Sequence, residues 1–276
     1  ITSFRTTGPI GPARLVNIRA GDSIDQMYVG VLGMDGLPDP TSPKDVNAAI
    51  VSNLLTPSSA TNFEFGRIRE MRISGDLTGT IDAYNVTNSY EMDPFGSTYG
   101  IFIAGDALAP INVEFGVTSA TIEAKSFAEP ITIGTYLLGK IEATDGRIEA
   151  VHIGRDEIPD GGISGFAGGG TGALWDPFRT EISEPECVIR AQSIGLVDIS
   201  QMEVHKFYPP RIESPTIDDM IIDEIVHGLI WSGVRSATDC PGPTTPVETY
   251  PCGPNAAKSE SNADIANSTI GSMYCG

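Results

Sequence analysis

Apolar residues in this chain recur with a spacing that fits neither a helix nor a simple alternating strand. One apolar residue is followed three positions later by Met or Val, and two positions after that by Ile or Val. Helical faces repeat at three, four and seven positions, so a step of three and then two predicts a corner that leads into a strand. The copies are Ile24-Met27-Val29, Ile68-Met71-Ile73, Ile148-Val151-Ile153, Ile194-Val197-Ile199 and Ile217-Met220-Ile222.

The spacing of these copies indicates a repeated structural unit. Their starts are separated by 44, 80, 46 and 23 residues, close to multiples of a unit of roughly 20 to 23 residues. Such a period is typical of solenoids, in which each unit buries its apolar face only against its neighbours. We therefore expect stacked units, some of which diverge from the pattern.

A second motif, Ile-acid-Ala, predicts the faces of the strands. Alternation with a period of two sends Ile and Ala inward and the acid outward, as a strand with one solvated face requires. The spacings of 41, 19 and 7 residues suggest two units, one unit and one side of a unit. The copies are Ile81-Asp82-Ala83, Ile122-Glu123-Ala124, Ile141-Glu142-Ala143 and Ile148-Glu149-Ala150.

Gly-Asp pairs between short apolar segments predict the corners. They occur at Gly21-Asp22, Gly75-Asp76 and Gly105-Asp106. Glycine readily adopts a positive φ, and an aspartate side chain bonds the backbone of its own turn.

These residues together resemble the right-handed parallel β-helix class, which is known in pectin-degrading enzymes, phage tailspikes and secreted surface proteins. The resemblance covers about residues 10 to 235 and lies in periodicity and corner chemistry. It implies an all-β fold, a β-solenoid of stacked parallel strands around one continuous core, and it points to no single family.

Three segments interrupt the pattern. A capping box at Ser42-Pro43-Lys44-Asp45 and an apolar stripe predict a short lateral helix at about residues 42–55. A glycine-rich loop is expected at about residues 161–178. The predicted solenoid domain spans residues 1–235, and residues 236–276 form a tail rich in Pro, Ser and Asn.

All four cysteines lie in the C-terminal third, and none forms a C-x-x-C pair typical of zinc or redox sites. Disulfides are therefore expected to hold the tail, and they favour an oxidising compartment. Cys240 and Cys252 bracket a proline-rich segment and are expected to pair, which leaves Cys187 with Cys275; the sequence permits three connectivities.

The net charge limits the classes of molecule that the chain is expected to bind. The chain has 36 Asp and Glu against 17 Lys and Arg, a net charge of −19, which disfavours binding to nucleic acid or anionic lipid. The apolar stretch from Met220 to Val234 is interrupted by charged residues and is shorter than a membrane span of ~20 residues. We expect an extracellular or cell-surface protein with no membrane span and no required cofactor.

The best catalytic candidates are Asp218, Asp219, Asp223 and His227, with Glu224 beside them. Glycoside hydrolysis needs two carboxylates in different environments. Pectin-hydrolysing β-helices carry Asn-x-Asp, Asp-Asp, Gly-His-Gly and Arg-x-Lys motifs, but here Val226-His227-Gly228 lacks the first glycine and Arg-x-Lys is absent. Acids that decorate corners and strand exteriors are the favoured interpretation.

Acids stacked along one face predict a weak calcium or salt dependence. Neighbouring strands lie ~4.8 Å apart, where like charges are destabilising unless they are screened or bridged by cations. The candidate Ca²⁺ ligands are Asp82, Glu123, Glu142 and Glu149.

Three functions stay open. The leading hypothesis is a structural or adhesive surface rod, whose partners would be further copies of itself, in an oligomer or filament, or components of a cell envelope. The alternatives are a polysaccharide-active hydrolase or lyase, which needs two carboxylates facing one groove, and a phage-type fibre or tailspike, which needs an apolar interface along its length.

Overall fold

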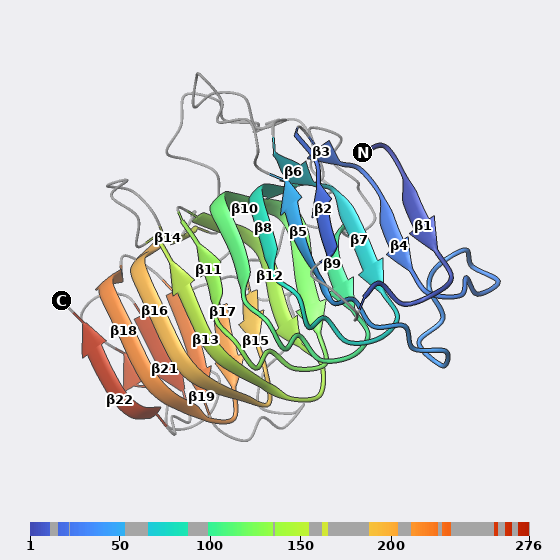
Figure 1. The fold of residues 1–276 in the computed structure, drawn as a ribbon. Coiled ribbons are helices and arrows are strands. Elements are labelled where there is room, and N and C mark those ends of the chain that lie inside the picture. Colours follow the sequence, from blue (N-terminus) through green and yellow to red (C-terminus); the bar gives the residue numbers. More distant parts are fainter. Residues whose placement is uncertain are drawn as a thin grey trace, which may run out of the picture.

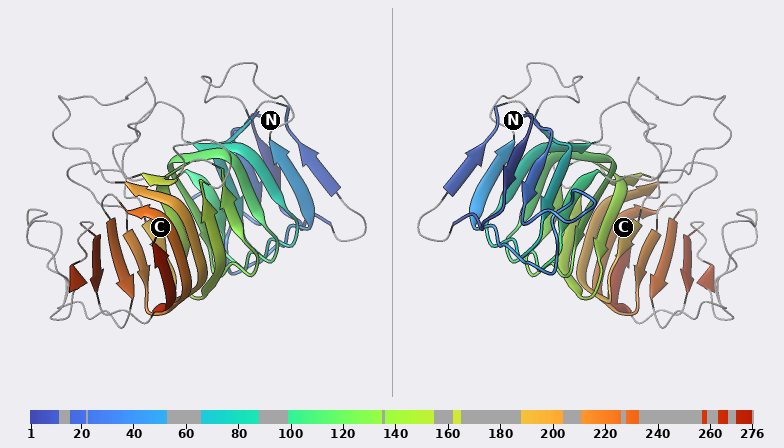
Figure 2. Two further views of the ribbon diagram at one scale, coloured as in Figure 1. Left: turned by 90° about the vertical axis from the view of Figure 1, so that its left-hand side faces the viewer. Right: turned by 90° about the vertical axis from the view of Figure 1, so that its right-hand side faces the viewer.

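A computed structural model of the 276-residue chain shows an all-β protein built from parallel strands. The structure describes residues 1–11, 16–21, 23–52, 66–87, 99–134, 136–154, 162–164, 188–203, 211–225, 228–232, 257–258, 263–266 and 270–275. Over these residues the secondary structure consists of strands, bridges and turns, without a helix. The strands lie side by side in a stack that runs from the N-terminal strands (blue) to the C-terminal strands (red) (Figures 1 and 2).

The first ladder of parallel strands extends through the whole stack. Its last strand, β21, also pairs with β20 (Ala257–Lys258) in the antiparallel sense. In order of pairing the ladder contains β1 (Phe4–Thr6), β4 (Met27–Val29), β7 (Glu70–Ile73), β9 (Gly100–Ile103), the end of β10 (Ile111–Ala124), the end of β12 (Tyr136–Ala143), β15 (Val188–Arg190), β17 (Arg211–Ser214), β19 (Gly228–Ser232) and β21 (Ala263–Ala266).

The second and third ladders follow the first in each pass of the chain. The second contains β2 (Val16–Arg19), β5 (Ala48–Ser52), the start of β8 (Ile81–Thr87), the start of β10, β11 (Ile131–Ile133), the end of β13 (Arg147–Ile153), the middle of β16 (Ser193–Glu203), the middle of β18 (Ile217–Ile225) and β22 (Ile270–Cys275). The third contains β3 (Ser23–Ile24), β6 (Arg67–Ile68), the end of β8, the middle of β10, the start of β12, β14 (Gly162–Ser164) and the ends of β16 and β18.

We call one pass through the three ladders a rung. Between the first and second ladders the chain turns a corner, where single residues of successive rungs form parallel bridges. These corner residues are Ile10, Val46, Leu77, Ala107, Phe127 and Ile148.

Copies of the repeat motif do stack on one another, but the number of residues in one structural unit is not always the expected, roughly 20 to 23. Ile24-Met27-Val29 pairs directly with Ile68-Met71-Ile73, and Ile148-Val151-Ile153 pairs directly with Ile194-Val197-Ile199, so each of these spacings is one rung and not two. The first two copies join the third ladder to the first, and the later copies join the corner to the second ladder. The interval of 80 residues between the second and third copies therefore does not correspond to a whole number of rungs.

The Ile-acid-Ala motif predicted the strand faces correctly. In all four copies Ile and Ala are buried and the acid is at least partly exposed. Ile122 pairs with Ile141, so the interval between the second and third copies is one rung, as expected. Ile81 pairs with Ile111 in the second ladder, whereas Ile122 lies in the first ladder. The interval between the first two copies is therefore not two whole rungs, and that interpretation is wrong.

The helix expected at residues 42–55 is absent from its described part, residues 42–52, of which residues 48–52 form strand β5. Val46, Ala48, Ile50 and Ser52 are buried at alternate positions, which is the period of a strand, and β5 pairs with β2 and β8. The apparent helical stripe arose because residues 49 and 50 are both apolar. Residues 53–55 lie outside the described residues.

Aspartates at the corner bind the next rung. Asp45 Oδ1 accepts a hydrogen bond from Asp76 N at 3.0 Å, and Asp76 Oδ1 accepts one from Asp106 N at 2.8 Å. Asp106 Oδ1 in turn accepts from Ser126 Oγ at 2.7 Å. The first two carboxylates thus satisfy backbone N–H groups of the following rung, in place of groups in their own turn.

The glycines that precede Asp76 and Asp106 are required for space. Gly75 and Gly105 have no positive φ, contrary to the expectation from the sequence. A Cβ at Gly105 would collide with the carboxylate of Asp76, and one at Gly75 with that of Asp45. Each glycine thus admits the aspartate of the preceding rung.

Removal of one corner carboxylate tests this arrangement. Asp76→Ala should lower the free energy of unfolding by about 1–2 kcal/mol because it leaves the Asp106 N–H without its acceptor. In a chain of this size that corresponds to roughly 2–4 °C of melting temperature per kcal/mol. Asp145→Ala removes the same charge from an exposed turn and is the control. Equal melting temperatures of the two variants would contradict the role of Asp76.

Candidate functional site

The outer face of the second ladder carries a row of side chains, most of them polar. Strand register places one outward residue of each rung directly beside that of the next. This row, the outer row, consists of Arg19, Val51, Asp82, Asn112, Thr132, His152, Asp198 and Ile221.

Neighbours in the outer row bind one another. Asn112 Nδ2 donates a hydrogen bond to Asp82 Oδ1 at 2.8 Å. His152 Nδ1 lies 3.1 Å from Asp198 Oδ2, with both side chains partly exposed. Thr132 stands between these two pairs in the register. The row therefore presents carboxylate, amide, hydroxyl and imidazole groups in sequence.

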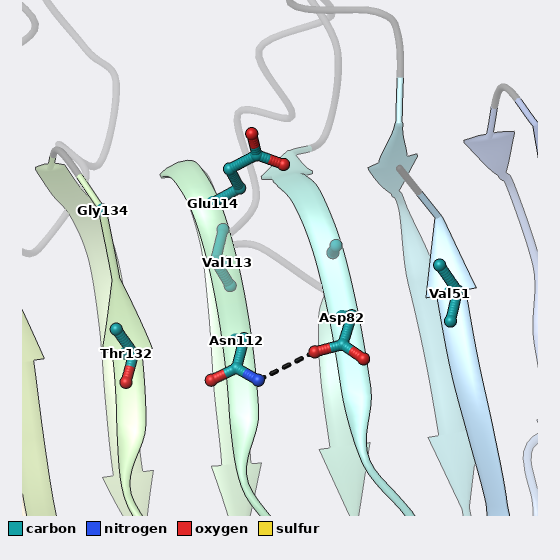
Figure 3. A pocket seen from close by; sticks show the side chains of 8 residues that line it. Val51, Asp82, Asn112, Val113, Glu114, Thr132 and Gly134 are labelled. Atoms are coloured by element: carbon teal, nitrogen blue, oxygen red, sulfur yellow. Dashed lines mark hydrogen bonds between the residues drawn. The ribbon is translucent and has the colours of Figure 1, made fainter. Parts of the chain in front are cut away.

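An open groove of about 390 Å³ lies over part of this row. Figure 3 shows Thr132, Asn112, Asp82 and Val51 on four neighbouring strands, with Glu114 above Val113 in the view. Ala83, Val113 and Gly134 complete the lining. No lysine or arginine lines this groove in the part of the chain that the structure describes.

A β-bulge shapes the upper end of the groove. The register between β8 and β10 shifts by one residue between Val113 and Gly116, so that Glu114 and Phe115 stand opposite Tyr84 alone. Glu114 is exposed beside the groove, while Phe115 stacks on Tyr84 with ring centroids 5.6 Å apart. Bulges commonly redirect side chains at functional sites.

Three aromatic side chains form a cluster around the bulge. Phe115 also contacts Tyr136 edge to face, at 5.4 Å between centroids. All three rings are half-buried. Burial and the charge of Glu114 raise the pKa of the Tyr84 hydroxyl, which therefore stays a neutral donor at physiological pH.

The outer face of the first ladder carries a second row, which combines contacts between arginines and aromatic rings with ion pairs. Arg5 lies over the Tyr28 ring at 4.9 Å and Arg72 over the Phe102 ring at 4.2 Å. Burial and a hydrogen bond to Glu70 raise the pKa of Tyr28 to about 12. The row comprises Arg5, Tyr28, Arg72, Phe102, Glu123, Glu142, Arg190 and Glu213.

Within this row two glutamates are direct neighbours. Glu123 is in register with Glu142, and burial together with the Glu142 charge raises the pKa of Glu123, although Arg72 and Lys140 act in the opposite direction. Arg190 binds Glu142 at 3.3 Å and Glu213 at 2.8 Å. Glu142 therefore belongs to an ion-pair network, whereas Glu123 is a weaker acid than an ordinary glutamate.

Only Asp218 and Asp219 of the predicted catalytic residues have described side chains, so the catalytic site stays a prediction. Asp218 is exposed and pairs with Arg147 at 2.7 Å, and Arg147 also binds Glu149 at 2.9 Å. Asp219 is exposed in the same strand. Asp223 and Glu224 lie in β18, where only their backbone is described, and His227 lies outside the described residues.

The four candidate calcium ligands are spread over the molecule. Glu123 and Glu142 are neighbours, whereas Asp82 lies in the outer row and Glu149 lies beside Arg147. In the described parts of the chain, no three His, Cys, Asp or Glu side chains come together to hold a metal ion. Calcium binding by these residues stays a prediction.

Other expected features fall largely outside the described residues. Cys187, Cys240 and Cys252 lie there, and only the backbone of Cys275 is described, so the pairing is untested. Of the loop at residues 161–178 only β14 is described. Within the described segments, no helix is both long and apolar enough to cross a membrane.

Sequence reasoning missed the groove. Alternation around Ile81, Ile111 and Ile131 marks Asp82, Asn112 and Thr132 as outward positions, and this signal was available. The pairing of β8 with β10 and the bulge at Glu114 were not available, because insertions and bulges leave no periodic trace.

No protein-family model matches this chain, and no curated protein or solved structure is significantly similar to it.

Neutralising Glu123 tests the glutamate pair. A folded-state pKa above the unfolded value means that stability present in acid is lost as pH rises through the raised pKa. Glu123→Gln should remove this loss and stabilise the protein at neutral pH by about 0.5–1 kcal/mol, with less gain in acid. Urea unfolding at neutral and at acidic pH measures the change in the free energy of unfolding. The control is Glu129→Gln, at an exposed corner; an equal gain from Glu129→Gln would contradict the assignment.

Proposed function

We propose that this chain is a right-handed parallel β-helix that serves as an extracellular structural or adhesive rod. The chain passes through the first ladder, the corner, the second ladder and the third in constant order, as a β-helix requires. Parallel crossover connections are almost always right-handed, which supports the proposed hand.

The observation that carries the proposal is the pairing of side chains from one rung to the next on several sides of the stack. Asp76 binds Asp106 at the corner, and Asn112 binds Asp82 on the second ladder. Arg190 joins Glu142 and Glu213 on the first ladder. Polar residues used in this way stiffen the stack along its length, which suits a rod.

Composition supports the extracellular part of the proposal. A net charge of −19 keeps a long protein surface soluble and repels other anionic polymers. The four cysteines suit an oxidising compartment. Its partners would be components of a cell envelope or further copies of the chain.

Binding without turnover tests the function. The purified chain should co-sediment with at least one preparation from a panel of microbial and plant cell walls, and should release neither reducing sugar nor unsaturated product from it. Thermally unfolded chain is the control for non-specific adhesion. Failure to bind any wall preparation would refute the adhesive role, and steady release of sugar would establish the alternative, a polysaccharide-active enzyme.

The cysteine pairing has a separate test. We propose that Cys240 pairs with Cys252 and Cys187 with Cys275, which would tie the tail to the end of the stack. Proteolysis without reduction should yield these two linked peptides by mass spectrometry. Free thiols in the secreted protein, or another of the three connectivities, would contradict the pairing.

A further inference from the structure

The groove on the outer row combines features that a flat strand surface lacks. It crosses β5, β8, β10 and β11, from Val51 on one side to Thr132 and Gly134 on the other. We infer that this groove binds an uncharged saccharide chain. The inference rests on the proposed adhesive function and assigns that function to one site.

The polar groups in the groove suit hydroxyl ligands. Asn112 uses one N–H to bind Asp82, which fixes the amide and leaves its second N–H and its carbonyl oxygen available. Asp82 has a second carboxylate oxygen, and Thr132 adds a hydroxyl. Because each sugar hydroxyl both donates and accepts, neighbouring hydroxyls can bind an amide and a carboxylate at once.

Charge favours a neutral ligand. Asp82 and Glu114 would repel a phosphate, sulfate or uronate, and the groove lining contains no cationic side chain among the described residues. A bare cation fits less well, because the described residues bring no third carboxylate, His or Cys to these two. Basic peptides are the competing class.

The aromatic cluster offers apolar contact next to the groove. Tyr84 and Phe115 do not line the groove themselves, but each directly follows a lining residue, Ala83 and Glu114. Both rings are half-buried, and the bulge stacks Phe115 on Tyr84. The apolar C–H face of a sugar ring packs against aromatic surface, while its hydroxyls reach polar groups nearby. The Tyr84 hydroxyl, a neutral donor, adds a further hydrogen bond.

The outer row favours an extended chain over a single sugar. Successive strands lie ~4.8 Å apart, so polar groups repeat at that distance across the rungs. Beyond the groove the row continues with His152 and Asp198. A polymer lying across the strands would therefore meet further polar groups after leaving the groove.

Affinity electrophoresis tests the site. The full chain is run in native gels that contain dextran, mannan, xyloglucan or laminarin, with polygalacturonate and polylysine as charged comparisons. We expect retardation by at least one neutral polysaccharide, little affected by salt. Retardation by polylysine, lost in salt, is expected from the net charge of −19 alone and does not report on the groove. No retardation by any neutral polysaccharide would overturn the inference.

Variants locate the binding. Asn112→Ala should weaken it roughly tenfold, the equivalent of one hydrogen bond, and Glu114→Gln severalfold. Glu129→Gln, outside the groove, should bind as the unmodified chain does. If Asn112→Ala does not fold, Thr132→Val removes a single hydroxyl from the same row. Unchanged binding by folded groove variants would overturn the site.

The same variants separate the two proposals. If the unmodified chain and Asn112→Ala adhere equally to cell walls, the rod is adhesive but this groove is not its site. If the unmodified chain binds no wall preparation yet binds a soluble neutral polysaccharide through Asn112, the site stands and the adhesive role fails.

Discussion

The in-register stacking of inward aliphatic side chains is the constraint on which the rest of the structure depends. One such column in the second ladder contains Ile50, Ile81, Ile111, Ile131, Val151, Val197 and Met220, none of them more than 1 % exposed. A single rung has too little surface to bury these residues, so each depends on the rungs above and below it. A slip of one residue would turn the apolar column outward, and register is therefore strongly specified.

The same constraint fixes the outside of the molecule. Because alternate residues face opposite ways, aligning Ile81 with Ile111 also places Asp82 beside Asn112, with no further signal needed. The outer face then has to accommodate neighbours at ~4.8 Å, where like charges repel. Pairing an acid with an amide, as here, or with Arg190, as on the first ladder, lets an acidic chain stack without accumulating repulsion.

These dependencies explain how far the sequence could be interpreted. The inward positions of Ile and Ala and the outward positions of the acids were predictable, because alternation is local. The strand that each strand pairs with was not predictable, because loops of very different length can connect two strands that pair in register. Ile101 pairs with Ile122 after a short interval, whereas Ile141 pairs with Ile189 after one more than twice as long. The helix wrongly expected over the described residues 42–52 has the same origin. The adjacent apolar residues 49 and 50 gave a helical stripe, whereas the pairing of β5 with β2 and β8 buries alternate residues.

The candidate site lies where the register is interrupted, and the interruption has a physical consequence. Along a regular ladder each outward residue lies beside its counterpart in the next rung, and polar neighbours can hydrogen-bond or form ion pairs with each other. The bulge between Val113 and Gly116 inserts one residue, so that Glu114 and Phe115 share the place of Tyr84. One of the two can continue the aromatic contact while the other is directed elsewhere, here to the edge of the groove. A stack built for regularity thus gains a distinctive surface at the point where its pairing fails to repeat.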